Sequence, residues 1–135
     1  MTRAVQAFKA RYNTYYNGHV AYLDGCLAQE NGNKDNYTDI IPLYITGNKA
    51  TVSIGKSDFD RAVEKCQKTI KQHTITKRPE WNSNKRKTEK DRIWLSQKEY
   101  NPFLYKAWFL MGKAQFQKGE YLEAASTFAY MEQLY

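Results

Sequence analysis

The sequence predicts an all-α fold in which antiparallel helical hairpins form one domain. Two observations predict it: apolar residues recur at spacings of three and four along most of the chain, and residues that favour helix ends stand between these stretches. With 135 residues, 41% of them hydrophobic, the chain is long enough to bury a core. No run of residues approaches the roughly 20 apolar positions of a membrane span, and no apolar N-terminal signal segment is visible.

The first stretch predicts two short helices that pair as a hairpin. Helical spacing joins four residues of 3–16: Ala4, Phe8, Tyr12 and Tyr15. Asn17-Gly18 is expected to end this helix, and Asn17 to cap a second one. Four residues of the second helix share one face: Tyr22, Leu23, Cys26 and Leu27. Because the break is so short, the two helices are expected to lie antiparallel.

A change of character follows, before a third helix that bridges to the last hairpin. Residues 43–54 are rich in β-branched residues around Gly47-Asn48, which predicts either a small β-hairpin or an irregular connection. Ser57 is expected to cap the third helix, with Asp58 and Asp60 near the positive end of its dipole. Its apolar stripe consists of Phe59, Ala62, Val63, Cys66 and Ile70. It should end before Arg78-Pro79.

Residues 77–95 are predicted to form a basic loop. Seven basic and three acidic residues within 77–92 give this segment +4 of the net charge of +7. Trp81 and Ile93–Leu95 are its apolar exceptions and are expected to dock onto the helices. A solvated loop is the favoured interpretation, and contact with nucleic acid or anionic lipid headgroups is the alternative.

The last hairpin has the clearest boundaries in the sequence. Asn101-Pro102 is expected to open the fourth helix, because a capping residue followed by proline suits a first helical turn. This helix should run to about Gln117, and 118–120 should form a tight turn. A fifth helix should run from Tyr121 to the end of the chain.

This hairpin resembles a tetratricopeptide repeat. The matching positions are Trp108, Met111, Gly112, Ala124 and Phe128. The resemblance implies that Gly112 and Ala124 allow close helix approach, and that Trp108 and Phe128 fill the space beside neighbouring repeats. Gln115 and Met131 depart from the pattern, since an aromatic and a small residue are usual there. We expect 1–135 to be one tetratricopeptide-like domain from the N-terminal part of a longer repeat array.

Four phrases together resemble a narrower family, the tetratricopeptide-repeat outer-membrane lipoproteins of Bacteroidetes associated with gliding motility and type IX secretion. The phrases are Tyr12–Gly18, Ile41–Tyr44, Ala62–Cys66 with Ile70 and His73, and Glu99–Pro102. The resemblance implies a scaffold at the periplasmic face of the outer membrane that holds secretion or motility components. In that family a lipidated cysteine precedes the tyrosine-rich phrase, and this chain has none before Arg3.

The function expected from these patterns is partner binding without catalysis, with no cofactor and no metal. The residues expected to face a protein or peptide partner lie along the fourth helix: Lys106, Phe109, Lys113, Phe116 and Gln117. Their burial under neighbouring repeats is the competing interpretation. Cys26 and Cys66 are expected to be small buried side chains, although one disulfide between them is an open alternative.

The competing functional class is nucleotide binding through residues 50–57. Ala50–Ser57 satisfies a loose phosphate-loop pattern, but Val52-Ser53-Ile54 lacks the glycines that let a loop wrap phosphate. His19 and His73 have no carboxylate or cysteine at ligand spacing. We therefore expect no enzyme, and no nucleic-acid partner.

Overall fold

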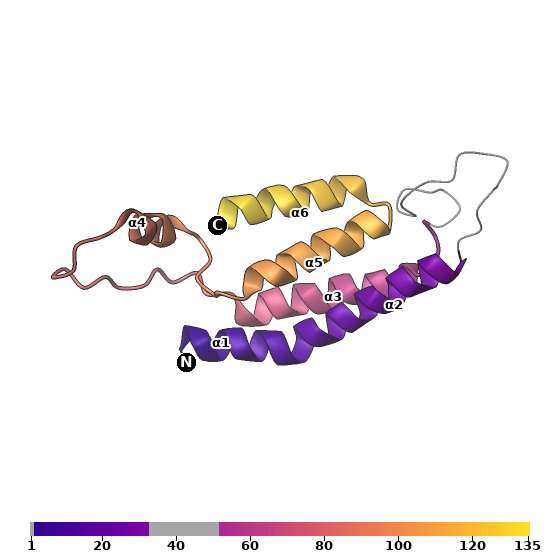
Figure 1. Ribbon diagram of the computed structural model, residues 1–135, viewed down its shortest axis with the longest axis horizontal. Coiled ribbons are helices and arrows are strands. Elements are labelled where there is room, and N and C mark those ends of the chain that lie inside the picture. The colour runs from indigo at the N-terminus through magenta and orange to yellow at the C-terminus, as the bar shows by residue number, and fades with distance from the viewer. Residues whose placement is uncertain (1, 33–51) are drawn as a thin grey trace.

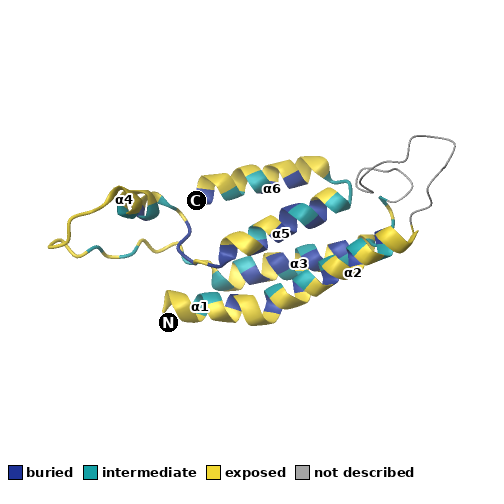
Figure 2. Ribbon diagram, in the orientation of Figure 1, coloured by how far each residue is buried: buried dark blue, intermediate teal, exposed yellow. Residues whose placement is uncertain are grey.

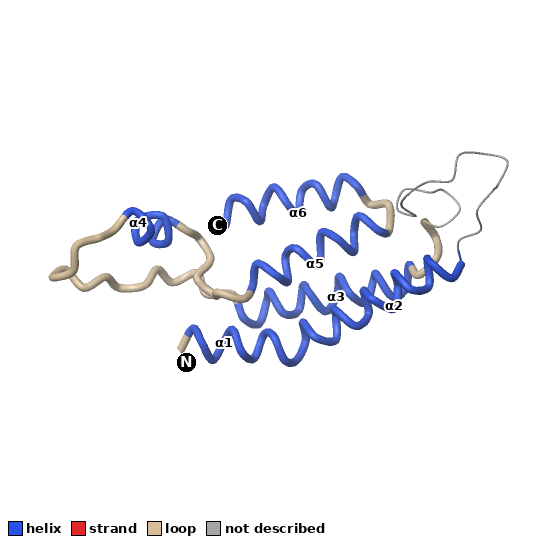
Figure 3. The backbone as a smooth tube through the Cα atoms, in the orientation of Figure 1, coloured by secondary structure: helices blue, strands red, loops and turns tan. Residues whose placement is uncertain are grey.

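The computed structural model of the chain describes residues 2–32 and 52–135. Its helical elements in chain order are α1 (Arg3–Ala10), a π-helical turn η1 (Arg11–Tyr15), α2 (Tyr16–Gly32), α3 (Lys56–His73), α4 (Glu89–Ser96), α5 (Leu104–Gln117) and α6 (Tyr121–Leu134). The described residues contain no β-strand (Figure 3), so the prediction of an all-α fold is confirmed.

The long helices lie side by side as a stack of antiparallel neighbours (Figure 1). α1, η1 and α2 form one continuous rod that packs on α3, α3 packs on α5, and α5 packs on α6. The rod with α3, and α5 with α6, are therefore two successive hairpins in a helical repeat-like arrangement. Both chain ends lie at the end of the stack from which residues 74–103 extend as an arm carrying α4.

The predicted hairpin within residues 3–32 is wrong, because the chain continues through Asn17-Gly18 as helix. Gly18 is buried in the rod, and a Cβ there would lie 3.1 Å from the Cβ of Lys65 and 3.4 Å from the carbonyl oxygen of Ala62. A glycine inside a helix costs about 1 kcal/mol relative to alanine. Here its small size lets α3 approach the rod closely, so it is a packing residue and not a helix break.

Both hairpins use a glycine of the first helix to receive a phenylalanine ring of the second. In the first hairpin Phe59 is fully buried, and a Cβ at Gly25 would lie 2.8 Å from its ring. In the second hairpin a Cβ at Gly112 would overlap the ring of Phe128. The same kind of contact, a ring against a glycine, therefore closes both hairpins.

The start of α3 differs from the prediction. The N-terminal cap is Gly55, which has φ of +72° and no side-chain hydrogen bond to the helix, so Ser57 is not the cap. Gly55 lies against the backbone of Gly25, where any side chain would collide with the carbonyl oxygen. Val52–Ile54 form a turn, and the rest of the β-branched segment 43–54 lies outside the described residues. α3 ends at His73, before Arg78-Pro79 as expected.

The arm is not only a loop, because its second half forms α4. Thr88 and Asp91 build a capping box: the Asp91 N–H donates to the Thr88 hydroxyl (3.3 Å) and the Thr88 N–H donates to the Asp91 carboxylate (2.9 Å). Leu95 is buried, and Trp94 packs edge-on against Tyr100 at 5.8 Å. The Arg3 guanidinium of α1 lies 4.6 Å from the centre of the Trp94 ring, so Trp94 docks on the rod as expected. Ile93, in contrast, is 55% exposed.

Glu99 fastens the arm to the body of the stack. Its carboxylate is 3% exposed and accepts hydrogen bonds from the backbone N–H groups of Ile75 (2.8 Å), Tyr100 (3.1 Å) and Asn101 (2.9 Å). The hydroxyl of Thr74 donates to the same carboxylate. The segment that enters the arm and the segment that leaves it are therefore both hydrogen-bonded to one buried carboxylate.

The last hairpin confirms the predicted boundaries to within two residues. Asn101 is buried, and its side chain accepts from the Phe103 N–H at 3.0 Å just before α5 begins at Leu104. Gly119 has φ of +84° in the turn between α5 and α6. Gln115, where an aromatic side chain was expected, is buried and accepts a hydrogen bond from the Thr127 hydroxyl at 2.6 Å.

Candidate protein-binding groove

A groove of about 370 Å³ runs along the outer side of α5. Seven residues from the rod, α5 and α6 line it: Tyr15, Tyr105, Lys106, Phe109, Leu110, Lys113 and Met131. α5 forms the floor, since Leu110 is almost completely buried, while Tyr15 and Met131 come from the helices on its two sides. Apart from the two lysines the lining is apolar or aromatic, and no acidic residue contributes to it.

Phe109 stands between the two lysines of this groove. Its ring is 47% exposed and tilts against Phe128 at 5.8 Å. The Lys113 ammonium lies 5.2 Å from the centre of the Phe109 ring and 4.9 Å from the centre of the Tyr22 ring. Such cation–π contacts contribute about 0.5–1 kcal/mol at exposed sites, so they orient the ammonium without neutralising it.

Neither lysine of the groove has an acidic partner in the part of the chain that the structure describes. The ion pairs found there involve Arg61, Arg92 and Lys118, and none reaches Lys106 or Lys113. The Lys106 ammonium lies over an aromatic face, 5.6 Å from the centre of the Phe103 ring. The groove therefore presents two uncompensated positive charges beside an apolar floor.

Two phenols of the rod lie beside the groove: Tyr15 lines it, and Tyr22 contacts Lys113. Burial, together with a hydrogen bond to Cys26, raises the pKa of Tyr22 to about 12. Burial also raises the pKa of Tyr15, which packs edge-on against Phe103 at 4.9 Å. Because these phenols stay protonated, they do not oppose the field of the two lysines.

Three of the five residues expected to bind a partner meet in the groove, and two do not. Lys106, Phe109 and Lys113 line it. Phe116 is exposed farther along α5, where it packs against Tyr121 at 5.2 Å. Gln117 is partly buried, and its carbonyl oxygen accepts a hydrogen bond from the Gln29 side chain at 3.1 Å.

The residues expected to have structural roles lie within or beside the core. Met111, Gly112 and Ala124 are buried between helices. Trp108 packs against Tyr130 at 5.2 Å, with its indole N–H buried and without a hydrogen-bond partner in the described part of the chain. Phe128 fills the notch at Gly112 inside the hairpin, and not a space beside a neighbouring hairpin as we expected.

No family model matches the chain, and no curated protein is significantly similar to it. In the described ranges, no three or more histidine, cysteine or acidic residues are grouped so that they could hold a metal ion. No helix among them has the length and apolar character needed to cross a membrane.

The two cysteines occupy separate positions and are both free thiols. Burial raises the pKa of Cys66 to about 12. Cys26 is only partly buried, and burial again raises the pKa of its thiol. The expectation of small buried side chains is confirmed for Cys66, and the alternative of a disulfide between the two is not what the structure shows.

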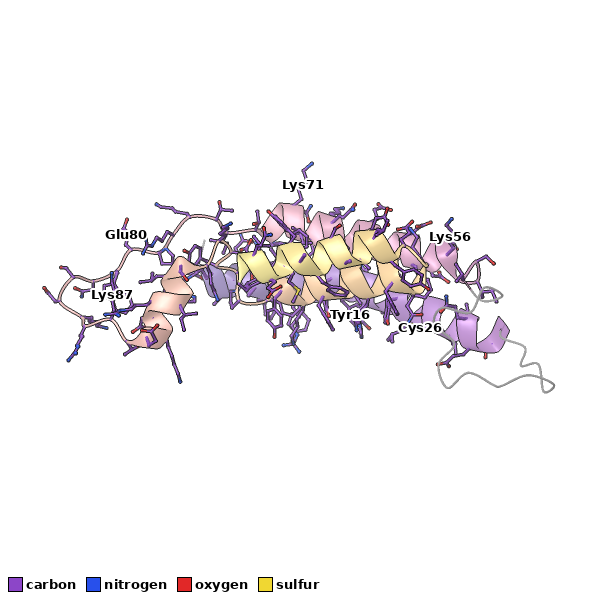
Figure 4. The ribbon with its side chains drawn as sticks, turned by 90° about the horizontal axis from the view of Figure 1, so that it is seen from above. Tyr16, Cys26, Lys56, Lys71, Glu80 and Lys87 are labelled. Atoms are coloured by element: carbon purple, nitrogen blue, oxygen red, sulfur yellow. The ribbon has the colours of Figure 1, made fainter. Side chains whose placement is uncertain are left out.

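The basic arm displays its charges to solvent. The basic side chains of residues 77–92 are all exposed: Lys77, Arg78, Lys85, Arg86, Lys87, Lys90 and Arg92. Among these, the structure pairs Arg92 with Glu89 at 3.7 Å. Glu80 and Lys87 mark the arm in Figure 4, where it extends beyond the end of the stacked helices. Trp81 is partly buried and donates its indole N–H to the Lys85 carbonyl oxygen at 2.8 Å, which closes the arm on itself.

Proposed function

We propose that the chain is a non-catalytic scaffold of the tetratricopeptide type that binds a segment of a partner protein in the groove along α5. The observation that carries the proposal is the exposed Phe109 ring between two lysines without acidic partners. The stacked hairpins and the repeat signature of α5 and α6 support it, because such folds commonly bind extended peptides across their first helices.

The groove favours a segment in which an apolar side chain stands beside carboxylates. Phe109, Tyr105 and Met131 offer apolar contact for such a side chain. Lys106 and Lys113 offer charge-assisted hydrogen bonds on its two sides, each stronger than a neutral one. Burial of an aromatic anchor in such a pocket usually dominates the binding energy of a peptide complex.

A random peptide display selection on the isolated chain tests the proposal directly. We expect enriched peptides to carry Asp or Glu next to an aromatic or aliphatic residue, and to bind by fluorescence anisotropy. Phe109→Ala should weaken binding at least tenfold, and Lys113→Glu should do so in a salt-dependent way. Phe116→Ala is the matched control, because this ring is equally exposed on α5 but lies outside the groove. Equal losses in Phe109→Ala and Phe116→Ala would refute the assignment of the groove.

We further propose that this scaffold works in the cell envelope, at the periplasmic face of the outer membrane, as a lipid-anchored protein that supports secretion or gliding machinery. The support is the resemblance of Tyr12–Gly18, Ile41–Tyr44, Ala62–Cys66 and Glu99–Pro102 to Bacteroidetes lipoproteins. Crosslinking and affinity recovery of the protein from its native cells tests it. Envelope secretion or motility components are the expected product, and soluble metabolic enzymes would contradict it.

The exposed basic arm supports a second candidate function, which is nucleic-acid binding. Phosphate contacts by several lysines and arginines would make affinity fall steeply with salt. Binding of single-stranded DNA at 50 and 200 mM salt, with Lys85→Glu and Lys87→Glu variants, would distinguish this function from peptide binding.

The phosphate-loop alternative for residues 50–57 is tested by a thermal shift with ATP and magnesium, because a ligand that binds the folded chain raises its melting temperature. Close packing of Gly55 against the Gly25 backbone already accounts for the glycine at this position without a bound phosphate.

A further inference from the structure

The rod carries a second apolar face that the described elements leave largely exposed. Six side chains form it, and we call them the outer stripe: Phe8, Tyr12, Tyr16, Val20, Leu23 and Leu27. They are 38–64% exposed. Figure 2 shows the outer side of the rod as mostly exposed, in contrast to the side that faces α3.

The outer stripe lies opposite the buried face of the rod. The buried positions are Ala10, Thr14, Gly18, Ala21, Gly25 and Gln29. Most members of the stripe stand two residues from one of these, which is about 200° around a helix. The stripe places one large apolar side chain on every turn for about 19 residues, or roughly 28 Å along the axis. A helix with apolar residues on two opposite faces needs a partner on both.

The size of the stripe matches what a stable dimer needs. About half of the surface of six large apolar side chains amounts to roughly 600 Å² in each copy, or about 1,200 Å² in a pair of copies. That is the lower end of the area of a specific protein interface, before any flanking polar residue is added. Exposed apolar patches of this size on soluble proteins usually mark an interaction site.

Side-chain size along the stripe favours a second copy that runs in the opposite direction. The first half is aromatic (Phe8, Tyr12 and Tyr16) and the second half is aliphatic (Val20, Leu23 and Leu27). The Phe8 and Tyr12 rings pack at 4.7 Å as a ridge between two hollows of about 300 and 470 Å³. An antiparallel partner places its aliphatic half beside this ridge, where the hollows can receive smaller side chains.

The charges of the rod point the same way. All its lysine and arginine residues, Arg3, Lys9 and Arg11, precede Tyr16, and both its acidic residues, Asp24 and Glu30, follow it. Antiparallel copies bring the basic half of each rod beside the acidic half of the other, whereas parallel copies would bring like charges together. Asp24 also forms an ion pair with Arg61 of α3 at 3.7 Å, in which both side chains remain exposed and open to a second partner.

We propose that the outer stripe is the interface of a homodimer in which two rods pack antiparallel, with the two-fold axis between Tyr16 and Val20. The contact uses the exposed face of the rod, whose aromatic half borders Gln72 and His73 at the end of α3 and Pro102 and Phe103 before α5. The proposal is independent of the peptide groove, whose wall uses Tyr15 on a different face of the rod. Two grooves would then belong to one particle.

Analytical ultracentrifugation of the chain between about 5 and 200 μM tests the proposal. We expect a concentration-dependent dimer that Tyr12→Lys with Leu23→Lys converts to a monomer of unchanged circular dichroism. Leu122→Lys is the matched control, because Leu122 is 82% exposed on α6 and outside the stripe. A monomer at 200 μM would overturn the proposal, and so would a dimer that the stripe substitutions leave intact. A monomer that binds vesicles of anionic phospholipid through the stripe would also overturn it, in favour of a membrane surface.

Crosslinking in a Cys26→Ser background tests the direction of the two rods. A cysteine placed at Tyr16 should react with its copy through a short bismaleimide, because both lie beside the axis. A cysteine placed at Phe8 should not react with its copy, since antiparallel rods separate the two by roughly 28 Å. It should react with a cysteine placed at Leu27 in a mixed sample. Efficient crosslinking between two Phe8→Cys copies would show a parallel dimer and refute the proposed arrangement.

Discussion

Glu99→Ala should loosen the arm and destabilise the whole chain. The substitution leaves three backbone N–H groups, those of Ile75, Tyr100 and Asn101, without their acceptor. Each unsatisfied buried donor costs about 1–3 kcal/mol, and relaxation of the arm would offset part of the combined cost of the three donors. Removal of a carboxylate that is costly to bury offsets a further part of this cost. We therefore expect a loss of about 3–5 kcal/mol in the free energy of unfolding.

Glu99→Gln separates the contribution of charge from that of shape. The amide keeps one oxygen for the backbone donors, and its nitrogen can donate to the Thr74 hydroxyl in place of the present bond. The hydrogen bonds then lose only the extra strength that the negative charge gives them, so a smaller loss of about 1–2 kcal/mol is expected.

Urea denaturation followed by circular dichroism measures both losses. With a slope of about 2 kcal/mol per molar urea, Glu99→Ala should lower the midpoint by about 2 M. Glu64→Ala is the matched control, because Glu64 is exposed on α3 and should change stability by less than about 0.5 kcal/mol. Trypsin should also cut the basic arm of Glu99→Ala faster than that of the parent chain. Equal midpoints for Glu99→Ala and Glu64→Ala would refute the assigned role of the carboxylate.

Three further predictions concern packing, reactivity and pH. Gly112→Ala should lower the melting temperature, at a cost of about 1–3 kcal/mol, because its methyl group meets the Phe128 ring; a higher melting temperature, as helix propensity alone predicts, would contradict this packing. A thiol reagent at pH 8 should modify Cys26 slowly in the native chain and Cys66 only after unfolding, and rapid labelling of both would show that α3 is not packed as described. Burial, and to a smaller extent the charge of Lys9, lower the pKa of His73 below 6.5, so the unfolded chain binds the proton more readily than the folded chain. The free energy of unfolding should therefore fall as the pH drops through 6.5 towards the lowered pKa. His73→Gln should remove this part of the pH dependence of the urea midpoint, and an unchanged dependence would contradict the assignment.

The second hairpin was predictable from sequence because its signals are local. Asn101 caps a turn with its own side chain, and Gly119 supplies the left-handed conformation between α5 and α6. The first hairpin was mispredicted because Gly18 has a long-range role. A glycine inside a helix and a glycine that ends one look alike until the helix packed against it, here α3, is known.

α4 was missed although its capping box is visible as Thr88 followed by Asp91 at the third position. The strongly basic composition around it favoured a loop, and Tyr100, whose hydroxyl donates to the Leu95 carbonyl oxygen, lies beyond its end. The groove was predicted in part for a similar reason. Helical periodicity can place Lys106, Phe109 and Lys113 on one face, but it does not show that Tyr15 and Met131 form the walls.

The π-helical turn at Arg11–Tyr15 sets the angular position of the side chains before it relative to those after it around the rod axis. In a regular α-helix, side chains four residues apart drift around the axis, and a row of such residues spirals away from a straight partner. The wider turn, with about 4.4 residues, cancels that drift, so Ala10, Thr14 and Gly18 stay in line against α3. Deletion of one residue from this turn would leave a good helix but would rotate its first ten residues by about 100° relative to the rest. One extra residue in this turn therefore keeps the buried and the exposed rows of side chains straight along the rod. An insertion or deletion here would change which side chains face α3 and which face solvent.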